Sequence, residues 1–252
     1  MISTLDVFVL LAAGVLAGTV GTAGAIASLV SYPVLLAVGL PALSANVTNI
    51  IAVAACGPGS ALASRPELHG QAPWVRRHVP AVAVGAAIGT ALLLSTPAGV
   101  FRHVVPFLVA AGSLMLFFQP RLTARRSPHR GRADNIMLAA ALVVVSAYNG
   151  YFGAGSGVML LALLLVTVEQ HMQTANALKN ILIGVATAVS ALALMSFGPV
   201  DWAAVAPLAL GMFVGSTIGP RVARGLPAGV LRLLVVVVGL GLAVHLWLSS
   251  GS

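Results

Sequence analysis

Lys179 is the residue of this sequence whose type and position most clearly suggest chemistry. It lies inside an otherwise apolar stretch, about one and a half helical turns past Thr174. A lysine at the centre of a bilayer costs roughly 2.5 to 3.5 kcal/mol on insertion scales, so its burial there requires compensation. One interpretation is an ammonium group that faces a central anion site. The other is a side chain that snorkels to the cytoplasmic interface from near the start of a helix.

Amide and hydroxyl side chains accompany this lysine and recur in an earlier apolar stretch. Asn46 and Asn49 share a helix face at a spacing of three, and Asn176 and Asn180 do so at a spacing of four. Amides in an apolar segment need partners, which are either a neighbouring helix or a polar solute, and the sequence leaves both open. The candidate solute ligands of this kind are Asn46, Thr48, Asn49, Asn149, Asn176 and Asn180.

Two glycine clusters interrupt apolar segments, at residues 21–24 and 149–157. Glycine clusters interrupt helices and leave backbone groups unpaired, which a membrane tolerates only inside protein or beside a wet cavity. Free N–H groups and half-helix N-termini near the membrane midplane would favour an anion. The candidate ligands from these clusters are Gly21, Thr22, Gly24, Gly153 and Gly155.

The composition indicates the environment in which these residues work. Hydrophobic residues make up 59% and charged residues 7% of the 252 residues, and the mean hydropathy is +1.04. A soluble globule of this size needs more polar side chains to cover its surface. The lipid bilayer is therefore the expected solvent, and the chain is predicted to be an all-α polytopic membrane protein.

The net charge of +8 comes from basic residues in short connectors, such as Arg65, Arg76 and Arg77. Such clusters are typical of cytoplasmic anchors under the positive-inside rule. No aromatic residues interleave with them as a stacking platform, so we expect no nucleic-acid partner. We expect a multi-pass protein of a bacterial-type plasma (inner) membrane. The single cysteine, Cys56, excludes an internal disulfide.

An internal repeat divides the chain. The segment 97–102 (PAGVFR) recurs at 227–232 (PAGVLR). The distance along the chain from residue 97 to residue 227 is called the repeat offset below. At the same offset Gly85-Ala-Ala-Ile-Gly89 aligns with Gly215-Ser-Thr-Ile-Gly219, and Ala45-Asn46 aligns with Ala175-Asn176. We predict an N-terminal repeat over 1–125 and a C-terminal repeat over 126–252, which together form one membrane domain.

Each repeat is predicted to be a glycine-broken pair of short helices followed by three long transmembrane helices. The broken pairs cover 5–20 with 25–39 and 136–148 with 158–168, and either re-entrant hairpins or two short spans fit them. The basic connectors fall on one side of the membrane only if the two repeats are inverted. The long helices are expected at 42–63, 74–95 and 101–119, and at 174–196, 202–222 and 229–248.

These glycine and asparagine patterns resemble the TauE/SafE family of membrane proteins, which are described as sulfite and organosulfonate exporters. The resemblance rests on Gly21-Thr-Ala-Gly24 with residues 44–49 (SANVTN), and on residues 153–157 (GAGSG) with 174–180 (TANALKN). Asp201-Trp202 ahead of a span with Gly211, Gly215 and Gly219 adds to it. The resemblance implies export of a small sulfur-containing anion through a midplane site between the repeats.

Other classes of function fit less well. No nucleotide-binding loop is present, so a secondary transporter is favoured over an ATP-driven one. No carboxylate pair, zinc motif or Ser-His arrangement lies within the apolar stretches, so we expect no enzyme, no metal and no cofactor. The alternatives are a membrane scaffold or assembly protein, and a permease for an unrelated small anion. The sequence leaves open a homo-oligomer.

Overall fold

The computed structural model describes residues 3–101, 103–104, 107–108, 132–168 and 171–223. Helices without strands make up the regular structure of these ranges. The predicted span 229–248 lies outside the described residues, as does most of 101–119. The helices are α1 Thr4–Gly24, α2 Ala27–Ala37, α3 Ala42–Ala54, α4 Cys56–Ala63, α5 Arg65–Leu68, α6 Ala72–Ser95, α8 Arg132–Tyr151, α9 Ser156–Thr167, α10 Met172–Phe197 and α11 Trp202–Ala223.

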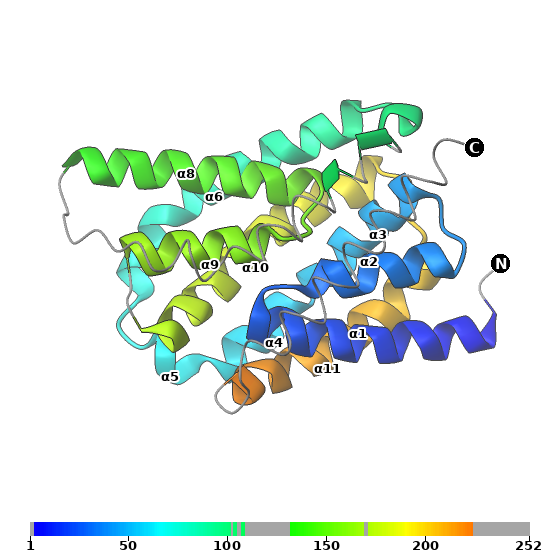
Figure 1. Ribbon diagram of the computed structural model, residues 1–252, viewed down its shortest axis with the longest axis horizontal. Helices are drawn as coiled ribbons and strands as arrows, with labels where there is room; N and C mark the ends of the chain where they lie inside the picture. Colours follow the sequence, from blue (N-terminus) through cyan, green and yellow to red (C-terminus); the bar gives the residue numbers. More distant parts are fainter. Residues whose placement is uncertain (1–2, 102, 105–106, 109–131, 169–170, 224–252) are drawn as a thin grey trace.

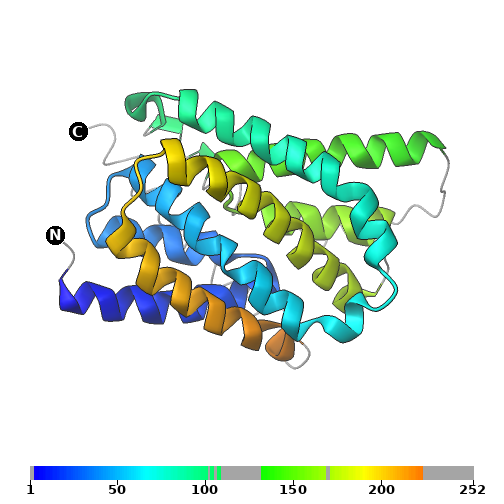
Figure 2. The same ribbon diagram turned by 180° about the vertical axis from the view of Figure 1, so that it is seen from behind.

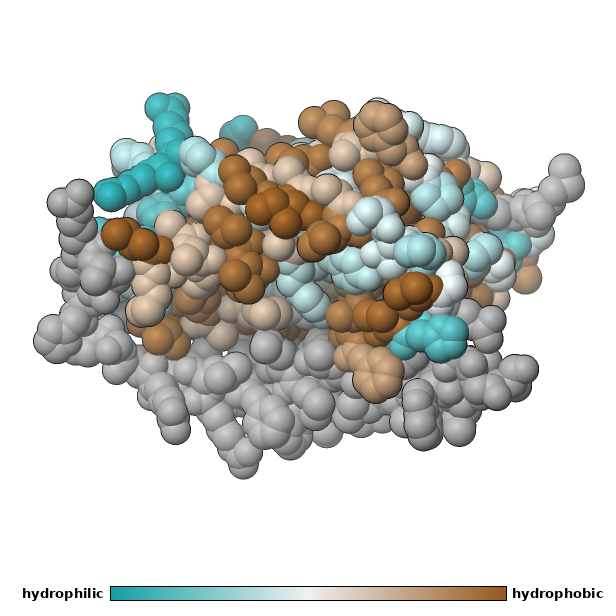
Figure 3. Space-filling model, turned by 90° about the horizontal axis from the view of Figure 1, so that it is seen from above, coloured by the Kyte–Doolittle hydropathy of each residue, from teal (hydrophilic) through white to brown (hydrophobic). Residues whose placement is uncertain are grey.

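The membrane class predicted from composition is confirmed. Five segments of the described chain are long and apolar enough to cross a bilayer: α1, α3 with α4, α6, α10 and α11. Large hydrophobic side chains on their outer faces are exposed, as lipid contact requires; Leu192 on α10 is one example, at 72%. Figure 3 shows hydrophobic residues across the middle of one face and hydrophilic ones toward its ends.

The first glycine cluster, 21–24, is helical and forms the last turn of α1, which corrects the prediction for 5–20 and 25–39. Helix α1 begins after Ser3, whose side chain and Asp6 form a capping box, and it continues through Gly24. The break falls at Ala25, where φ is 69°, and Ile26. Gly21 is helical and packs against Ala27 of the returning helix, where a Cβ would collide. The prediction of two short helices is therefore wrong for this pair, which joins a 21-residue helix to an 11-residue one.

The second broken pair has the same form. Helix α8 has 20 residues and α9 has 12. The break covers 152–155, inside the predicted cluster, and both of its glycines, Gly153 and Gly155, have φ above 80°. A positive φ is accessible to glycine without steric cost, so here the glycines do make the break.

The predicted span 42–63 is divided at Ala55 into α3 and α4. Pro58 explains the division, because proline lacks an N–H and its ring clashes with the carbonyl four residues earlier. The predicted span 174–196 has Ala188 at the position equivalent to Pro58 and forms one continuous helix, α10.

Close helix packing joins the two halves of the chain. Helix α1 lies along α11, and α8 lies along α6 (Figure 2). A Cβ at Gly14 would overlap the Leu208 carbonyl oxygen, and one at Gly85 would overlap that of Val143. Small residues at such spacing let helix backbones approach closely in membranes. The first helix of each half therefore packs on a helix of the other half.

The helix order repeats at the offset seen in the sequence. Helix α6 begins at Ala72 and α11 at Trp202, and α2 and α9 begin within one residue of the same offset. In Figure 1, α1 begins beside the N-terminus and α8 begins at the opposite side of the molecule, and both end near its middle. The predicted boundary between 125 and 126 lies outside the described residues, and the orientation of the halves in a membrane stays a prediction.

Candidate functional site

A cavity of about 50 Å³ lies where the two helix breaks meet α4 and α10. That volume holds roughly three to five water molecules. Both halves of the chain contribute to its wall, which is formed by Gly21, Thr22, Ala25, Ala27, Ser28, Val53, Cys56, Gly57, Ser60, Asn149, Gly153, Gly155, Ser156, Gly157, Lys179, Asn180, Ile183 and Gly184.

Lys179 points inward from α10 to this cavity. Its side chain is 1% exposed, so the snorkelling alternative is wrong. Its Nζ donates a hydrogen bond of 3.2 Å to the carbonyl oxygen of Gly21 in the last turn of α1. The C-terminal end of a helix carries partial negative charge, which stabilises a cation there. A lysine ammonium has three N–H donors, so two remain beyond the bond to Gly21.

Two amides of α10 flank the lysine and contact the same helix end. Asn176 and Asn180 donate from Nδ2 to the carbonyl oxygen of Thr22, at 2.9 and 3.1 Å. Unpaired carbonyls at a helix end need partners, and these amides supply them. Asn180 also lines the cavity, whereas Asn176 lies behind it.

The second break is held by its own side chains. Asn149 donates from Nδ2 to Ser156 Oγ at 2.8 Å, and Ser156 Oγ donates to the Gly153 carbonyl at 2.7 Å. All three residues line the cavity. These bonds fix the turn between α8 and α9, so that the start of α9 faces the cavity.

Two helix N-termini therefore point to one cavity. Helix α2 starts at Ala27 and α9 at Ser156. Ala27, Ser28 and Gly157 lie in the first turns of these helices, where backbone N–H groups have no partner within their own helix. The breaks touch each other, since a Cβ at Gly157 would lie 2.8 Å from the Ala25 carbonyl oxygen. Helix N-termini with free N–H groups bind anions, and the Lys179 ammonium adds a full positive charge.

Besides Asn176, four further residues predicted as ligands lie outside the cavity wall. Asn46 donates from Nδ2 to the Tyr151 carbonyl at 3.0 Å. Thr48 Oγ1 accepts from the Asp201 N–H at 3.1 Å, and Asn49 Oδ1 accepts from the Ser31 hydroxyl. The fourth, Gly24, forms the last residue of α1. For Asn46, Thr48 and Asn49, helix–helix hydrogen bonding is the role that these contacts support.

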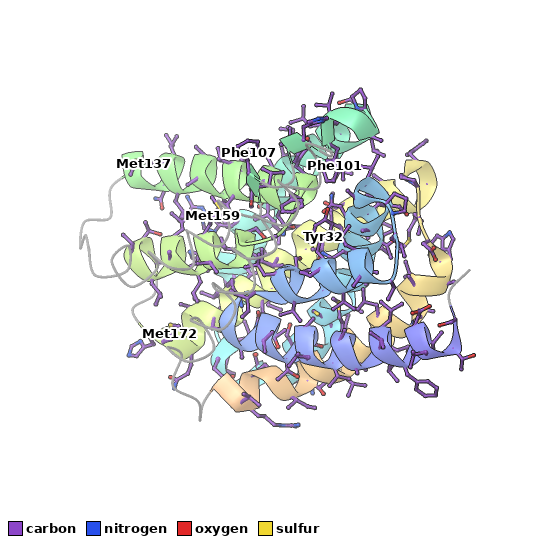
Figure 4. The ribbon with its side chains drawn as sticks, turned by 45° about the vertical axis from the view of Figure 1, so that its right-hand side comes forward. Tyr32, Phe101, Phe107, Met137, Met159 and Met172 are labelled. Carbon is purple, nitrogen blue, oxygen red and sulfur yellow. The ribbon has the colours of Figure 1, made fainter. Side chains whose placement is uncertain are left out.

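An aromatic cluster adjoins the second break on its other side. Phe152 lies edge-on to Tyr32, with ring centroids 5.4 Å apart, and 6.3 Å from the ring of Phe101. Tyr32 and Phe101 are labelled in Figure 4. All three rings are at most 2% exposed. This apolar cluster packs around the turn that carries Gly153.

Sequence reasoning missed several residues of the cavity wall. Gly57 and Gly184 bring α4 and α10 together, since a Cβ at Gly57 would lie 3.3 Å from Gly184 Cα. Their spacing from Ser60 and from Asn180, at three and four residues, is a signal that could have found them. The other residues missed are Ala25, Ala27, Ser28, Val53, Cys56, Ser60, Ser156, Gly157 and Ile183.

Comparisons with known proteins give one family. The family model described as "Sulfite exporter TauE/SafE" matches residues 7–246. A Sinorhizobium protein named "Probable membrane transporter protein ORF9" is 26% identical over 250 residues, covering 94% of this chain and 90% of its own. "Probable membrane transporter protein YfcA" of Escherichia coli K12 is 26% identical over 267 residues, covering 99% and 93%. A Haemophilus influenzae "Probable membrane transporter protein" is 27% identical over 165 residues, or 62% and 61%. No solved structure matches this chain significantly.

Proposed function

The chain belongs to the TauE/SafE family and is a membrane transporter, and from this we propose that it is a secondary transporter that exports a small sulfur-containing anion, sulfite or an organosulfonate. The solute would pass through the cavity between the two halves. The observation that carries this proposal is the convergence of Lys179 and two helix N-termini on that cavity.

The electrostatics support an anion over a neutral or cationic solute. The described residues that line the cavity include one formal charge, the Lys179 ammonium, and no Asp or Glu. Positive helix ends and an ammonium in a site with little water interact strongly with a negative charge. The cavity volume of about 50 Å³ suits a small oxyanion better than a long sulfonate.

We also propose that repeats 1–125 and 126–252 lie on either side of the transport path in inverted orientation. Basic side chains lie toward one end of the described structure, at Arg65, Arg76, Arg77 and Arg221, while Asp201 lies in the loop between α10 and α11. The positive-inside rule then makes the end that carries α5 cytoplasmic, in a bacterial-type inner membrane. Broken helices that meet at a site between repeats are typical of secondary transporters.

The scaffold alternative is not favoured. A scaffold without solute flux needs apolar packing through its centre. Here the centre holds a cavity with glycine, serine and asparagine in its wall and a buried ammonium. Such polar groups are costly in a membrane and commonly mark a solute path.

Flux into proteoliposomes tests the proposal. Purified protein should carry sulfite across the bilayer faster than protein-free vesicles, and a panel of sulfate, thiosulfate, taurine and chloride would rank the substrates. Leu192→Ala, on the exposed face of the same helix as Lys179, is the matched control and should retain flux. Flux of chloride alone would favour a permease for an unrelated anion, and no flux of any anion would contradict transport of this class.

A further inference from the structure

The Lys179 ammonium lacks a formal counter-charge among the described residues around the cavity. It is 1% exposed, and its hydrogen bond within the described structure is to the Gly21 carbonyl. Taking a charge out of water is strongly unfavourable unless an opposite charge compensates for the lost hydration. One carbonyl dipole at a helix end offsets part of that cost.

The elements packed around Lys179 bring few titratable groups to the cavity. Helix α4 contributes the Cys56 thiol, which lines the same cavity. The cavity-lining segments of α1, α2, α3, α8 and α9 contribute none. Helix α6 carries His78, but its Nδ1 lies 2.8 Å from the Trp74 carbonyl and the ring stacks on Trp74, outside the cavity wall. Helix α5 carries Arg65 and Glu67, α6 also carries Arg76 and Arg77, and α11 carries Arg221 near its end, all outside that wall.

We propose that Lys179 couples the anion to a proton: the empty site holds a neutral amine, and each anion binds together with one proton on Nζ. This inference rests on the proposed function. The neutral amine keeps two N–H donors, so the hydrogen bond to Gly21 survives the loss of the proton. The bound anion then supplies the negative charge that an ammonium would lack in the empty cavity.

The transport step conserves protons and charge. On the side of entry, the Nζ lone pair takes a proton from water as the anion takes its place in the cavity. On the other side, the anion leaves and Nζ returns that proton to water. One proton therefore accompanies each anion, and a monoanion crosses with no net charge. A pH gradient would drive such an anion toward the more alkaline compartment, so export into a more acidic medium requires an outward anion gradient that exceeds the pH gradient.

Calorimetric titration counts the proton directly. Wild-type protein in detergent is titrated with sulfate and with methanesulfonate, whose charges stay constant between about pH 6 and about pH 9, in buffers of different ionisation enthalpy. We expect uptake of about one proton per anion bound at the alkaline end of this range. The apparent affinity should weaken by up to about tenfold for each unit rise in pH, because one proton binds with each anion.

Variants assign the proton to its site. Lys179→Arg keeps a charge that is not lost in this pH range, so its binding should take up no proton and should not depend on pH. Cys56→Ala should keep the wild-type proton count, which excludes the thiol as the carrier. In proteoliposomes, an imposed pH gradient should accumulate methanesulfonate with wild-type protein and not with Lys179→Arg.

The outcomes separate the two proposals. Anion binding by wild-type protein with no proton uptake at any pH would overturn proton coupling and leave the anion site intact. Proton uptake that persists in Lys179→Arg would move the proton to another group and overturn the role of Lys179. If neither these anions nor sulfite bind, the anion transporter itself fails and the coupling falls with it. The number of protons taken up by wild-type protein can be measured even if none of the variants folds.

Discussion

The two helix breaks have similar shapes but differ in charge. At the repeat offset, Ala25 with φ 69° corresponds to Gly155 with φ 82°, and both precede the second helix of their pair. The end of α8 receives one amide from the other half, Asn46, whereas the end of α1 receives two amides and the ammonium of Lys179. The position equivalent to Lys179 is Asn49. The repeated backbone thus forms the cavity, and one half supplies its charge.

The largest expected difference between the halves is the side of the membrane that each loop faces. The loop at 64–71 and the equivalent loop at 198–201 should lie on opposite sides if the repeats are inverted. In a Cys56→Ala background, cysteines at His69 and at Asp201 should react with an impermeant reagent from opposite sides of oriented vesicles. Labelling of both from one side would contradict the inversion. A cysteine at Arg221 should match the one at His69.

The charge difference predicts unequal effects of substitutions at the equivalent positions 179 and 49. Lys179→Ala removes the cavity's formal charge, and the loss of one partner of a buried pair costs about 2–5 kcal/mol, so anion flux should fall by on the order of 100-fold or more. Asn49→Ala removes a hydrogen bond to Ser31 away from the cavity and should keep flux within about threefold of wild type. Flux must be normalised to folded, inserted protein. Equal effects would contradict a site charged by one half.

The backbone at the two breaks predicts stability effects of opposite sign. A non-glycine residue in the left-handed region costs about 1–2 kcal/mol, so Gly155→Ala should destabilise the protein by about that amount. Ala25→Gly removes such strain and should stabilise it by up to about 1 kcal/mol, less the extra flexibility of the unfolded chain. Thermal unfolding in detergent measures both. A stabilising Gly155→Ala would refute the assigned backbone.

The smallest effect concerns the amides that the two halves share. Asn46 and Asn176 occupy equivalent positions, and each donates to a carbonyl near a helix break of the other half. Interhelical hydrogen bonds in membranes average about 0.6 kcal/mol, so Asn46→Ala and Asn176→Ala should each lower stability by about that much. A second measurement is the shift in melting temperature that sulfate causes. Asn46→Ala should still show this shift. A much larger loss in one variant would show that the two amides differ in role.

Composition was sufficient to predict a helical membrane chain, and the repeat offset relates the starts of several described helices. Glycine was the ambiguous signal, because it serves either close packing or a positive φ. Gly21 packs within α1, whereas Gly153 and Gly155 make a true break. The break at Ala25 had no sequence signal, since alanine seldom adopts a left-handed conformation.

The sequence indicated which types of residue form the site, but not which residues they contact. A lysine with flanking asparagines in an apolar stretch indicated an inward-facing polar group, and Lys179 is buried. Its partner, Gly21, lies 158 residues away in sequence, and local patterns carry no information on such a contact. The same limit applies to Asn46 and Asn49, whose periodicity matched that of a ligand face although their contacts are with protein.

The packing of α1 on α11 has a consequence for biosynthesis. Thr19 Oγ1 lies 3.2 Å from the Gly215 carbonyl, 196 residues later in the chain. At synthesis rates of about 5–20 residues per second, α1 waits roughly 10 to 40 s for this partner to be made. During that interval its glycine face, with Gly14 and Gly18, is open to lipid or to insertion factors. A ribosome that stalls before α11 therefore leaves a nascent chain whose first helix lacks its main packing partner, and quality-control proteases can recognise that chain.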